Sequence, residues 1–341
     1  MDAIRAIGRI VTSTPGRIVI SAGLLAVVAR SIDWQTLNDS LSGAAWGWFA
    51  LGTVLIAAAL VVGCLRWHLL LHGAGLPTRI GETVRAYWIG TFSNNFLPTG
   101  YGGDAVRAWL VGRSGHPLAR ALTSVFVDRA VALVALFCLG WIGLAVAPVD
   151  IPGELSTLFW VTSLIGVLLT VVLALLLRRR GLGRFLPAFI RPWATVIAQT
   201  LRVYGRDHRL QLETTGLSLV YHTLSIASLW CLAEALDLGI SPATLAVVAP
   251  LVLIATLIPI SVAGFGVREG TYVVLLGQVG ASSGEATLLS VLSVVALAIA
   301  SLPGGVAIAL GQGGGFRDLT HAGAEGPGAV TGAQPGSVSP P

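Results

Sequence analysis

The fold is decided by residues 81–112, GETVRAYWIGTFSNNFLPTGYGGDAVRAWLVG. A first apolar leg of about 16 residues ends at Phe96, and after Pro98 and a glycine-rich turn the second leg, DAVRAWLVG, has only nine residues. Nine helical residues rise about 14 Å, roughly half the thickness of a hydrocarbon core. Two such legs joined by a Pro/Gly break predict a re-entrant helical hairpin, which enters and leaves a membrane on one side.

A second stretch, Leu238 to Gly284, has the same plan. Its leg Pro242 to Ile258 meets Pro259 and a glycine turn, and the return leg TYVVLLGQV is short. The two turns, FLPTGYGGDAVR and LIPISVAGFGVREG, each contain a proline, a hydroxyl residue, Gly-aromatic-Gly and a charged residue. This similarity indicates an internal repeat of the inverted kind that many transporters use.

The composition places both hairpins in an integral membrane protein. The chain of 341 residues is 55% apolar and 11% charged, with a mean hydropathy of +0.82, whereas globular chains carry roughly a quarter charged residues. Its 21 basic residues are all arginines, and most lie between apolar runs, where they set topology. We therefore expect no nucleic-acid partner despite the net charge of +5. Cys64, Cys138 and Cys231 lie inside apolar runs without a disulfide or zinc spacing.

The remaining apolar runs predict six full spans. They are Arg17–Ile32, Ala45–Leu65, Leu122–Ala147, Leu155–Leu177, Thr214–Leu236 and Ala286–Leu310. Because arginine-rich loops stay cytoplasmic, the N- and C-termini are predicted inside, the first hairpin opens from the cytoplasm, and the second opens from the outside. The predicted fold is an all-α polytopic membrane protein with about six full transmembrane helices and two inverted re-entrant hairpins. A bundle of eight to ten ordinary spans is the alternative.

The domain organisation follows from these runs. Residues 1–16 are predicted as a cytoplasmic N-terminus, 17–310 as the transmembrane domain, and 311–341 as a disordered C-terminal tail rich in Gly, Pro and Ser. Within the domain, residues 191–209 have the apolar spacing of an interfacial helix.

Six ionisable residues inside the predicted membrane region are the main functional candidates, because charge there is costly and is usually paired or functional. They are Asp104, Arg107, Asp128, Arg129, Arg268 and Glu269. Asp104 and Arg107 are spaced to pair on one helix face. Arg129 and Arg268 suit a phosphate group, which a guanidinium binds with two hydrogen bonds. Ion pairs that only hold the hairpins in place are the alternative, and the two interpretations are compatible.

The turns supply the other candidates for substrate binding or translocation. These are Pro98, Gly100, Tyr101, Gly102, Pro259, Ser261, Gly264, Phe265 and Gly266.

The other polar residues are weaker candidates for a functional site. His68 and His72 are four apart without the acidic partner of H-E-x-x-H, so no metal site is predicted. His222 is interpreted as a hydrogen-bonded core residue, with a proton relay as the alternative. No catalytic cluster and no nucleotide motif is visible, so we expect no enzyme activity and no cofactor.

The motifs resemble a known family, the flippase-like transmembrane domain of lysylphosphatidylglycerol synthases. The resemblance rests on N-x-x-P-T-x-x-G-G-D-x-x-R from Asn95 to Arg107, on Asp128 and Arg129, and on P-I-S-x-x-G-x-G-x-R-E from Pro259. It extends over about residues 15–310, with a departure at Ala263, where the family pattern has glycine. The chain has no room for the soluble aminoacyl-transfer domain, so a stand-alone member that does not transfer lysine is expected.

The resemblance implies translocation of a lipid between leaflets. We expect a phosphate-bearing lipid, anionic or polyprenyl-type, to be held by Arg107, Arg129 and Arg268, with Asp104, Asp128 and Glu269 orienting them. Tyr101 and Phe265 line the path in this hypothesis.

Two alternatives belong to other classes. One is a membrane enzyme or accessory subunit of lipid-linked sugar or phospholipid metabolism, which uses Asp104 and Asp128 as acids or metal ligands. The other is a scaffold that recruits a partner through the loop Arg178 to Arg209. The expected partners are a membrane lipid and a lipid-modifying enzyme. The expected location is the plasma membrane of a bacterium, and the oligomeric state is left open.

Overall fold

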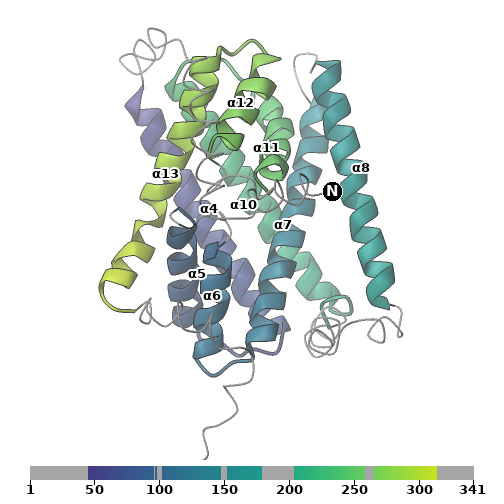
Figure 1. Cartoon of the computed structure of the whole chain (residues 1–341), viewed down its shortest axis with the longest axis vertical. Helices are drawn as coiled ribbons and strands as arrows, with labels where there is room; N and C mark the ends of the chain where they lie inside the picture. The colour runs from purple at the N-terminus through teal and green to yellow at the C-terminus, as the bar shows by residue number, and fades with distance from the viewer. Residues whose placement is uncertain are drawn as a thin grey trace, which may run out of the picture.

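The computed structural model describes residues 45–95, 97, 102–146, 152–178, 203–257 and 265–312. Over these ranges the chain folds into helices without a strand (Figure 1). The helices are α4 (Trp46–Gly73), α5 (Ile80–Asn94), α6 (Gly102–Arg113), α7 (Leu118–Val146), α8 (Gly153–Arg178), α10 (His208–Ala235), α11 (Pro242–Leu257), α12 (Val267–Gly277) and α13 (Ser283–Ala309).

Four of the helices are long and apolar enough to cross a membrane: α4, α7, α10 and α13. Their 27 to 29 residues rise about 40 Å, against a hydrocarbon core of about 30 Å. They match four of the predicted spans, so the chain is an integral membrane protein. Helix α8 has 26 residues and covers the fourth predicted span, Leu155–Leu177. The first predicted span, the N-terminal segment, residues 191–202 of the interfacial helix and residues 313–341 of the tail lie outside the described residues.

Helices α4 and α10 form an antiparallel pair at the centre of the bundle. At one end the amide of Ala45 donates to the carbonyl of Ala235, 3.0 Å away. Further along, the Ser228 hydroxyl donates to the Gly52 carbonyl at 2.7 Å. At the other end a side chain on Gly73 would collide with Leu210. Small residues on α4 therefore let the two backbones approach closely.

The other four helices are too short to span a bilayer. Helices α5, α6, α11 and α12 have 15, 12, 16 and 11 residues, which rise about 17 to 24 Å. The pair α5/α6 lies in the lower half of Figure 1 and the pair α11/α12 in the upper half, so the two pairs occupy opposite ends of the bundle. The return legs α6 and α12 are two or three residues longer than the predicted nine.

Tight backbone contacts hold the first short pair together. A side chain on Gly90 of α5 would collide with the carbonyl of Gly103 on α6, and one on Gly103 would collide with the carbonyl of Gly90. Helix α13 packs against α5 in the same way, because a side chain on Gly304 would overlap the carbonyl of Trp88. The small residues of α13 thus serve packing within the chain.

Helix α13 also connects the two short pairs. Its Ser290 contacts Arg268 of α12, and its Ser301 accepts a hydrogen bond of 2.9 Å from Asn95 at the end of α5. These serines are 11 residues apart, so they share one face of the helix about 16 Å from each other. Two buried apolar clusters surround these contacts, one around α4, α5 and α6 and one around α11, α12 and α13.

Candidate functional site

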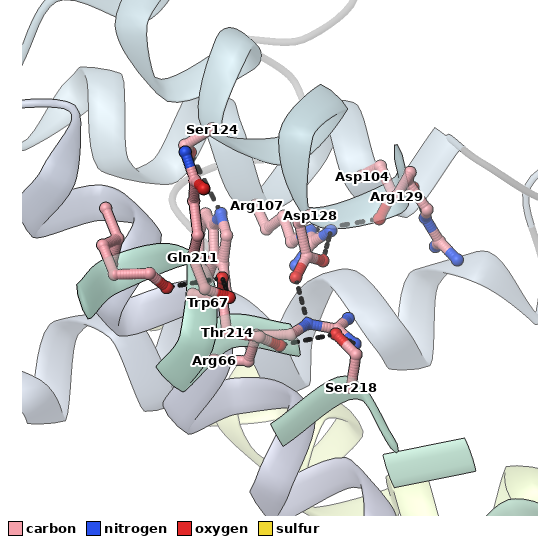
Figure 2. A network of polar contacts seen from close by, with 11 residues as sticks. Arg66, Trp67, Asp104, Arg107, Ser124, Asp128, Arg129, Gln211, Thr214 and Ser218 are labelled. Atoms are coloured by element: carbon pink, nitrogen blue, oxygen red, sulfur yellow. Dashed lines mark hydrogen bonds and ion pairs between the residues drawn. The ribbon is translucent and has the colours of Figure 1, made fainter. Parts of the chain in front are cut away.

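Asp128 of α7 is the centre of a buried polar network (Figure 2). Its carboxylate accepts a hydrogen bond from Arg66 Nε of α4 at 2.7 Å and another from Arg107 Nη2 of α6 at 2.9 Å. The side chains of all three residues are only 3 to 4% exposed. A carboxylate this deeply buried is tolerated because each of its oxygens binds a cation.

Asp104 continues the network toward the surface. One of its oxygens lies 3.0 Å from Arg107 Nε and the other accepts a hydrogen bond of 2.7 Å from Arg129 Nε. Asp104 also lies in the first turn of α6, where the helix dipole favours a negative charge. The order Arg66, Asp128, Arg107, Asp104, Arg129 alternates in sign, and we name this set the Arg–Asp network. Three arginines against two aspartates leave one net positive charge.

The guanidinium of Arg107 is packed between aromatic rings and carboxylates, and its side chain is 3% exposed. Its guanidinium carbon lies 4.7 Å from the centre of the Trp67 ring and 5.2 Å from that of Tyr87. Trp67 is itself fixed, because its indole N–H donates to the Ser124 hydroxyl at 3.1 Å. Two aromatic faces and two carboxylates therefore hold Arg107, and they favour a role in positioning the network.

The two ends of the network differ in exposure. Arg66 ends inside the bundle, where Nη1 donates to Ser218 at 3.1 Å and the guanidinium lies 5.2 Å from the centre of the Tyr221 ring. Arg129 ends at the surface of the described bundle, with 45% of its side chain exposed. Of the three arginines, Arg129 thus has the guanidinium that a ligand reaches most easily.

A second polar cluster lies at the start of α12. Arg268 Nη2 donates to Glu269 Oε1 at 2.7 Å, and Arg268 Nε donates to Ser290 at 3.1 Å. The other oxygen of Glu269 accepts the backbone N–H of Gly266 at 2.6 Å, which caps the helix at a residue with a φ of +83°. Glu269 is buried, whereas the Arg268 side chain is 20% exposed and lies against the Phe265 ring.

Between the two clusters lies a cavity of about 300 Å³. Arg268 and Tyr272 of α12 line it on one side, and Tyr221, His222 and Ser225 of α10 line it on another. Since Tyr221 also contacts Arg66, one wall of the cavity is shared with the Arg–Asp network.

The structure tests the predicted pairings. Asp104 pairs with Arg107, as the spacing of three predicts, and Arg268 pairs with its neighbour in the sequence, Glu269. Asp128 and Arg129 are adjacent in sequence but bind different partners, Asp128 the two buried arginines and Arg129 the outer carboxylate. Gly102 begins α6, and Gly266 and Phe265 precede α12. The predicted turn residues Pro98, Gly100, Tyr101, Pro259, Ser261 and Gly264 lie outside the described residues.

Arg66 is the functional candidate that sequence reasoning missed. The predicted limit of the second span, Leu65, is wrong, because α4 continues to Gly73 and buries Arg66. The signal was present in the sequence, since Leu69, Leu70 and Leu71 extend the apolar run beyond the arginine.

The histidines at the end of α4 take part in local hydrogen bonds. His68 Nδ1 lies 2.9 Å from the Thr83 hydroxyl, and His72 Nε2 lies 3.0 Å from the Thr78 carbonyl. Among the described residues, no group of three or more His, Cys, Asp or Glu side chains is placed to hold a metal ion.

Comparison with known families agrees with this architecture. The family model described as "Lysylphosphatidylglycerol synthase TM region" matches residues 16–305. The chain belongs to this family. The match takes in all of α4 to α12 and most of α13, including the Arg–Asp network and the Arg268 cluster. A search of curated proteins finds no match. Membership indicates a membrane domain with a lipid-related function.

Proposed function

We propose that the protein moves a phosphate-bearing lipid between the two leaflets of its membrane. The observation that carries this proposal is the position of Arg268, which lines a cavity of about 300 Å³ inside an apolar bundle. A headgroup crosses a bilayer slowly because its polar atoms must leave water. A cavity that offers a guanidinium replaces part of that lost hydration.

The two charged clusters suit successive steps of such a movement. Arg129 is 45% exposed at the outer end of the Arg–Asp network, and Arg268 is 20% exposed at the cavity. We assign phosphate binding to these two arginines and a positioning role to the enclosed Arg107. Asp104 and Glu269 hold the two guanidinium groups in place through Nε and Nη2 respectively.

The opposed short helices support the same proposal. In our proposal α5/α6 and α11/α12 are re-entrant hairpins that enter from opposite sides of the membrane, with the first open to the cytoplasm. A lipid that leaves Arg129 then meets a site of opposite orientation at Arg268, as in transporters built from inverted repeats.

The arrangement of the carboxylates disfavours the enzyme alternative. Asp104 and Asp128 each contact two arginines within 3.0 Å. Carboxylates held in this way are poor general acids, because the neighbouring cations stabilise the ionised form. The arrangement of Asp104 and Asp128 suits positioning of the arginines better than acid catalysis.

The test is leaflet exchange of fluorescent lipids in proteoliposomes that contain the full chain. Wild type is compared with Arg268→Gln, Arg129→Gln and the control Arg209→Gln, whose side chain is 88% exposed. Loss of a charge-assisted hydrogen bond of about 1.5 to 3 kcal/mol predicts a roughly 10- to 100-fold slower exchange of an anionic lipid in the first two variants. The control is expected to match wild type. Exchange equal to that of empty liposomes would refute the proposal.

A further inference from the structure

Ser290 of α13 lies between the two charged side chains at the start of α12. It is 0% exposed. Its hydroxyl oxygen accepts a hydrogen bond from Arg268 Nε at 3.1 Å, and the hydroxyl donates to Glu269 Oε1 at 3.3 Å. Arg268 Nη2 donates to the same carboxylate oxygen at 2.7 Å. The three side chains therefore close a ring of hydrogen bonds between α12 and α13.

This ring occupies one edge of the Arg268 guanidinium. In a planar guanidinium, Nε–H and one N–H of Nη2 point along one edge, and the other N–H groups lie on Nη1 and on the far side of Nη2. Ser290 and Glu269 bind the first edge. These two hydrogen bonds leave three of the five N–H donors of the group, and they lie on the edge formed by Nη1 and Nη2.

The free edge suits a phosphate, because a guanidinium binds that anion with two parallel hydrogen bonds from one edge. Arg268 is 20% exposed and lines the cavity. Its guanidinium carbon also lies 5.4 Å from the centre of the Phe265 ring, so contacts restrain both an edge and a face of the group. A side chain that is already ordered loses less conformational entropy when it binds a ligand.

Ser290 adds a restraint that the pair on α12 does not supply. Arg268 and Glu269 are neighbours in the sequence, and such a pair can form with more than one rotamer of the arginine. Ser290 lies 22 residues from Arg268 and belongs to another helix. Its contact at Nε therefore selects the direction of the guanidinium relative to α13.

We infer that Ser290 is a positioning residue of the proposed phosphate site, where it holds Arg268 Nε so that the edge formed by Nη1 and Nη2 is presented to the phosphate. The assignment rests on the proposed function, because the ligand of Arg268 is the one proposed there. It makes the contact between α12 and α13 a part of the binding site.

The first test is binding of fluorescent phosphatidic acid to the full chain in detergent micelles. Ser290→Ala removes the acceptor of Nε and keeps the charge of Arg268, so the affinity is expected to fall about 3- to 10-fold, as loss of one hydrogen bond predicts. Ser290→Thr keeps a hydroxyl and is expected to restore most of the affinity. Wild-type affinity in Ser290→Ala would overturn the assignment.

Ser301 provides the matched control on the same helix. It is also 0% exposed and also accepts a hydrogen bond from another element, that from Asn95 at 2.9 Å. Ser301→Ala is expected to lower the thermal unfolding midpoint about as much as Ser290→Ala and to leave the affinity for phosphatidic acid unchanged. An equal loss of affinity in both variants would indicate a general effect of α13 packing and would overturn the assignment.

A double-mutant cycle shows whether Ser290 acts through Arg268. In the background of Arg268→Ala, Ser290→Ala is expected to cause no further loss of affinity, because the hydrogen bond that it removes is already absent. The same 3- to 10-fold loss in that background would overturn the assignment. Wild-type affinity in Arg268→Ala alone would overturn it together with the phosphate site at Arg268.

Leaflet exchange in proteoliposomes separates this assignment from the proposed function. Binding that depends on Ser290 through Arg268, without protein-dependent exchange, would keep the assignment and refute translocation. Exchange that requires Arg268, with binding and exchange both unaffected by Ser290→Ala, would keep translocation and refute the assignment.

Discussion

Arg66 and Asp128 form an ion pair of 2.7 Å between α4 and α7, with side chains only 4% and 3% exposed. Asp128 also binds Arg107, so a single carboxylate connects α4, α6 and α7. Loss of one partner from a buried pair leaves a charge without compensation, which costs more than the pair contributes. Asp128 therefore matters for the folding of the first half of the bundle as well as for its electrostatics.

Replacement of Asp128 by Asn is expected to destabilise the protein strongly. The change leaves Arg66 and Arg107 buried with a neutral partner, at a cost of about 3 to 5 kcal/mol in unfolding free energy. The measurement is the thermal unfolding midpoint in detergent micelles. The control is Glu213→Gln, which breaks the exposed pair with Arg209 and is expected to cost less than about 1 kcal/mol. A similar midpoint for both variants would contradict the structural role of Asp128.

Glu269 is predicted to have two separable roles. Glu269→Gln keeps an oxygen for the N–H of Gly266 but loses the charge that holds Arg268, whereas Glu269→Ala loses both. The additional loss of the helix cap should make the alanine variant about 1 kcal/mol less stable than the glutamine variant. Equal midpoints for the two variants would show that the cap contributes nothing.

Contact between α5 and α6 is expected to depend on Gly90. The Cβ of Gly90→Ala would meet the carbonyl of Gly103, and such overpacking costs about 1 to 3 kcal/mol. Gly216→Ala on α10 meets no atom within 4 Å and should be neutral or stabilising, because alanine favours a helix. Thermal unfolding of both variants tests the difference, and a stable Gly90→Ala variant would count against the close contact.

The opposite orientation that we propose for the two short pairs predicts opposite labelling. Ser114 follows α6 and Ala281 precedes α13, and the pairs α5/α6 and α11/α12 lie in opposite halves of Figure 1. Single cysteines at these positions, in a chain without Cys64, Cys138 and Cys231, should react with a membrane-impermeant maleimide from opposite sides. Labelling of both from one side would contradict the proposed topology.

Much of the architecture could be predicted because hydropathy and charge act locally. The limits of α7, α8, α10 and α13 lie within six residues of those predicted. The Asp104–Arg107 pair could also be predicted, since a spacing of three places both side chains on one helix face.

The partners of Asp128 could not be predicted in the same way. Arg66 lies 62 residues from Asp128 in the sequence, and its pairing depends on how α4 packs against α7. The end of α4 could not be predicted either, because it depends on burial. Asp128 of the bundle pairs with Arg66, and this allows the buried helix to extend beyond that arginine. The cavity is likewise a product of packing, and no single residue of the sequence indicates it.

The most direct test of the account is whether closing the cavity stops lipid movement without any change in charge. Ser293→Phe places a ring in the cavity wall, and Thr157→Phe, at an exposed position on α8, is the control. Leaflet exchange of phosphatidylglycerol should be rapid in proteoliposomes with wild type and Thr157→Phe. It should be about tenfold slower or more with a folded Ser293→Phe variant, because tenfold corresponds to a rise of about 1.4 kcal/mol in the activation free energy of lipid passage. The account would be contradicted if wild type gave no protein-dependent exchange, or if Ser293→Phe exchanged lipid as fast as wild type.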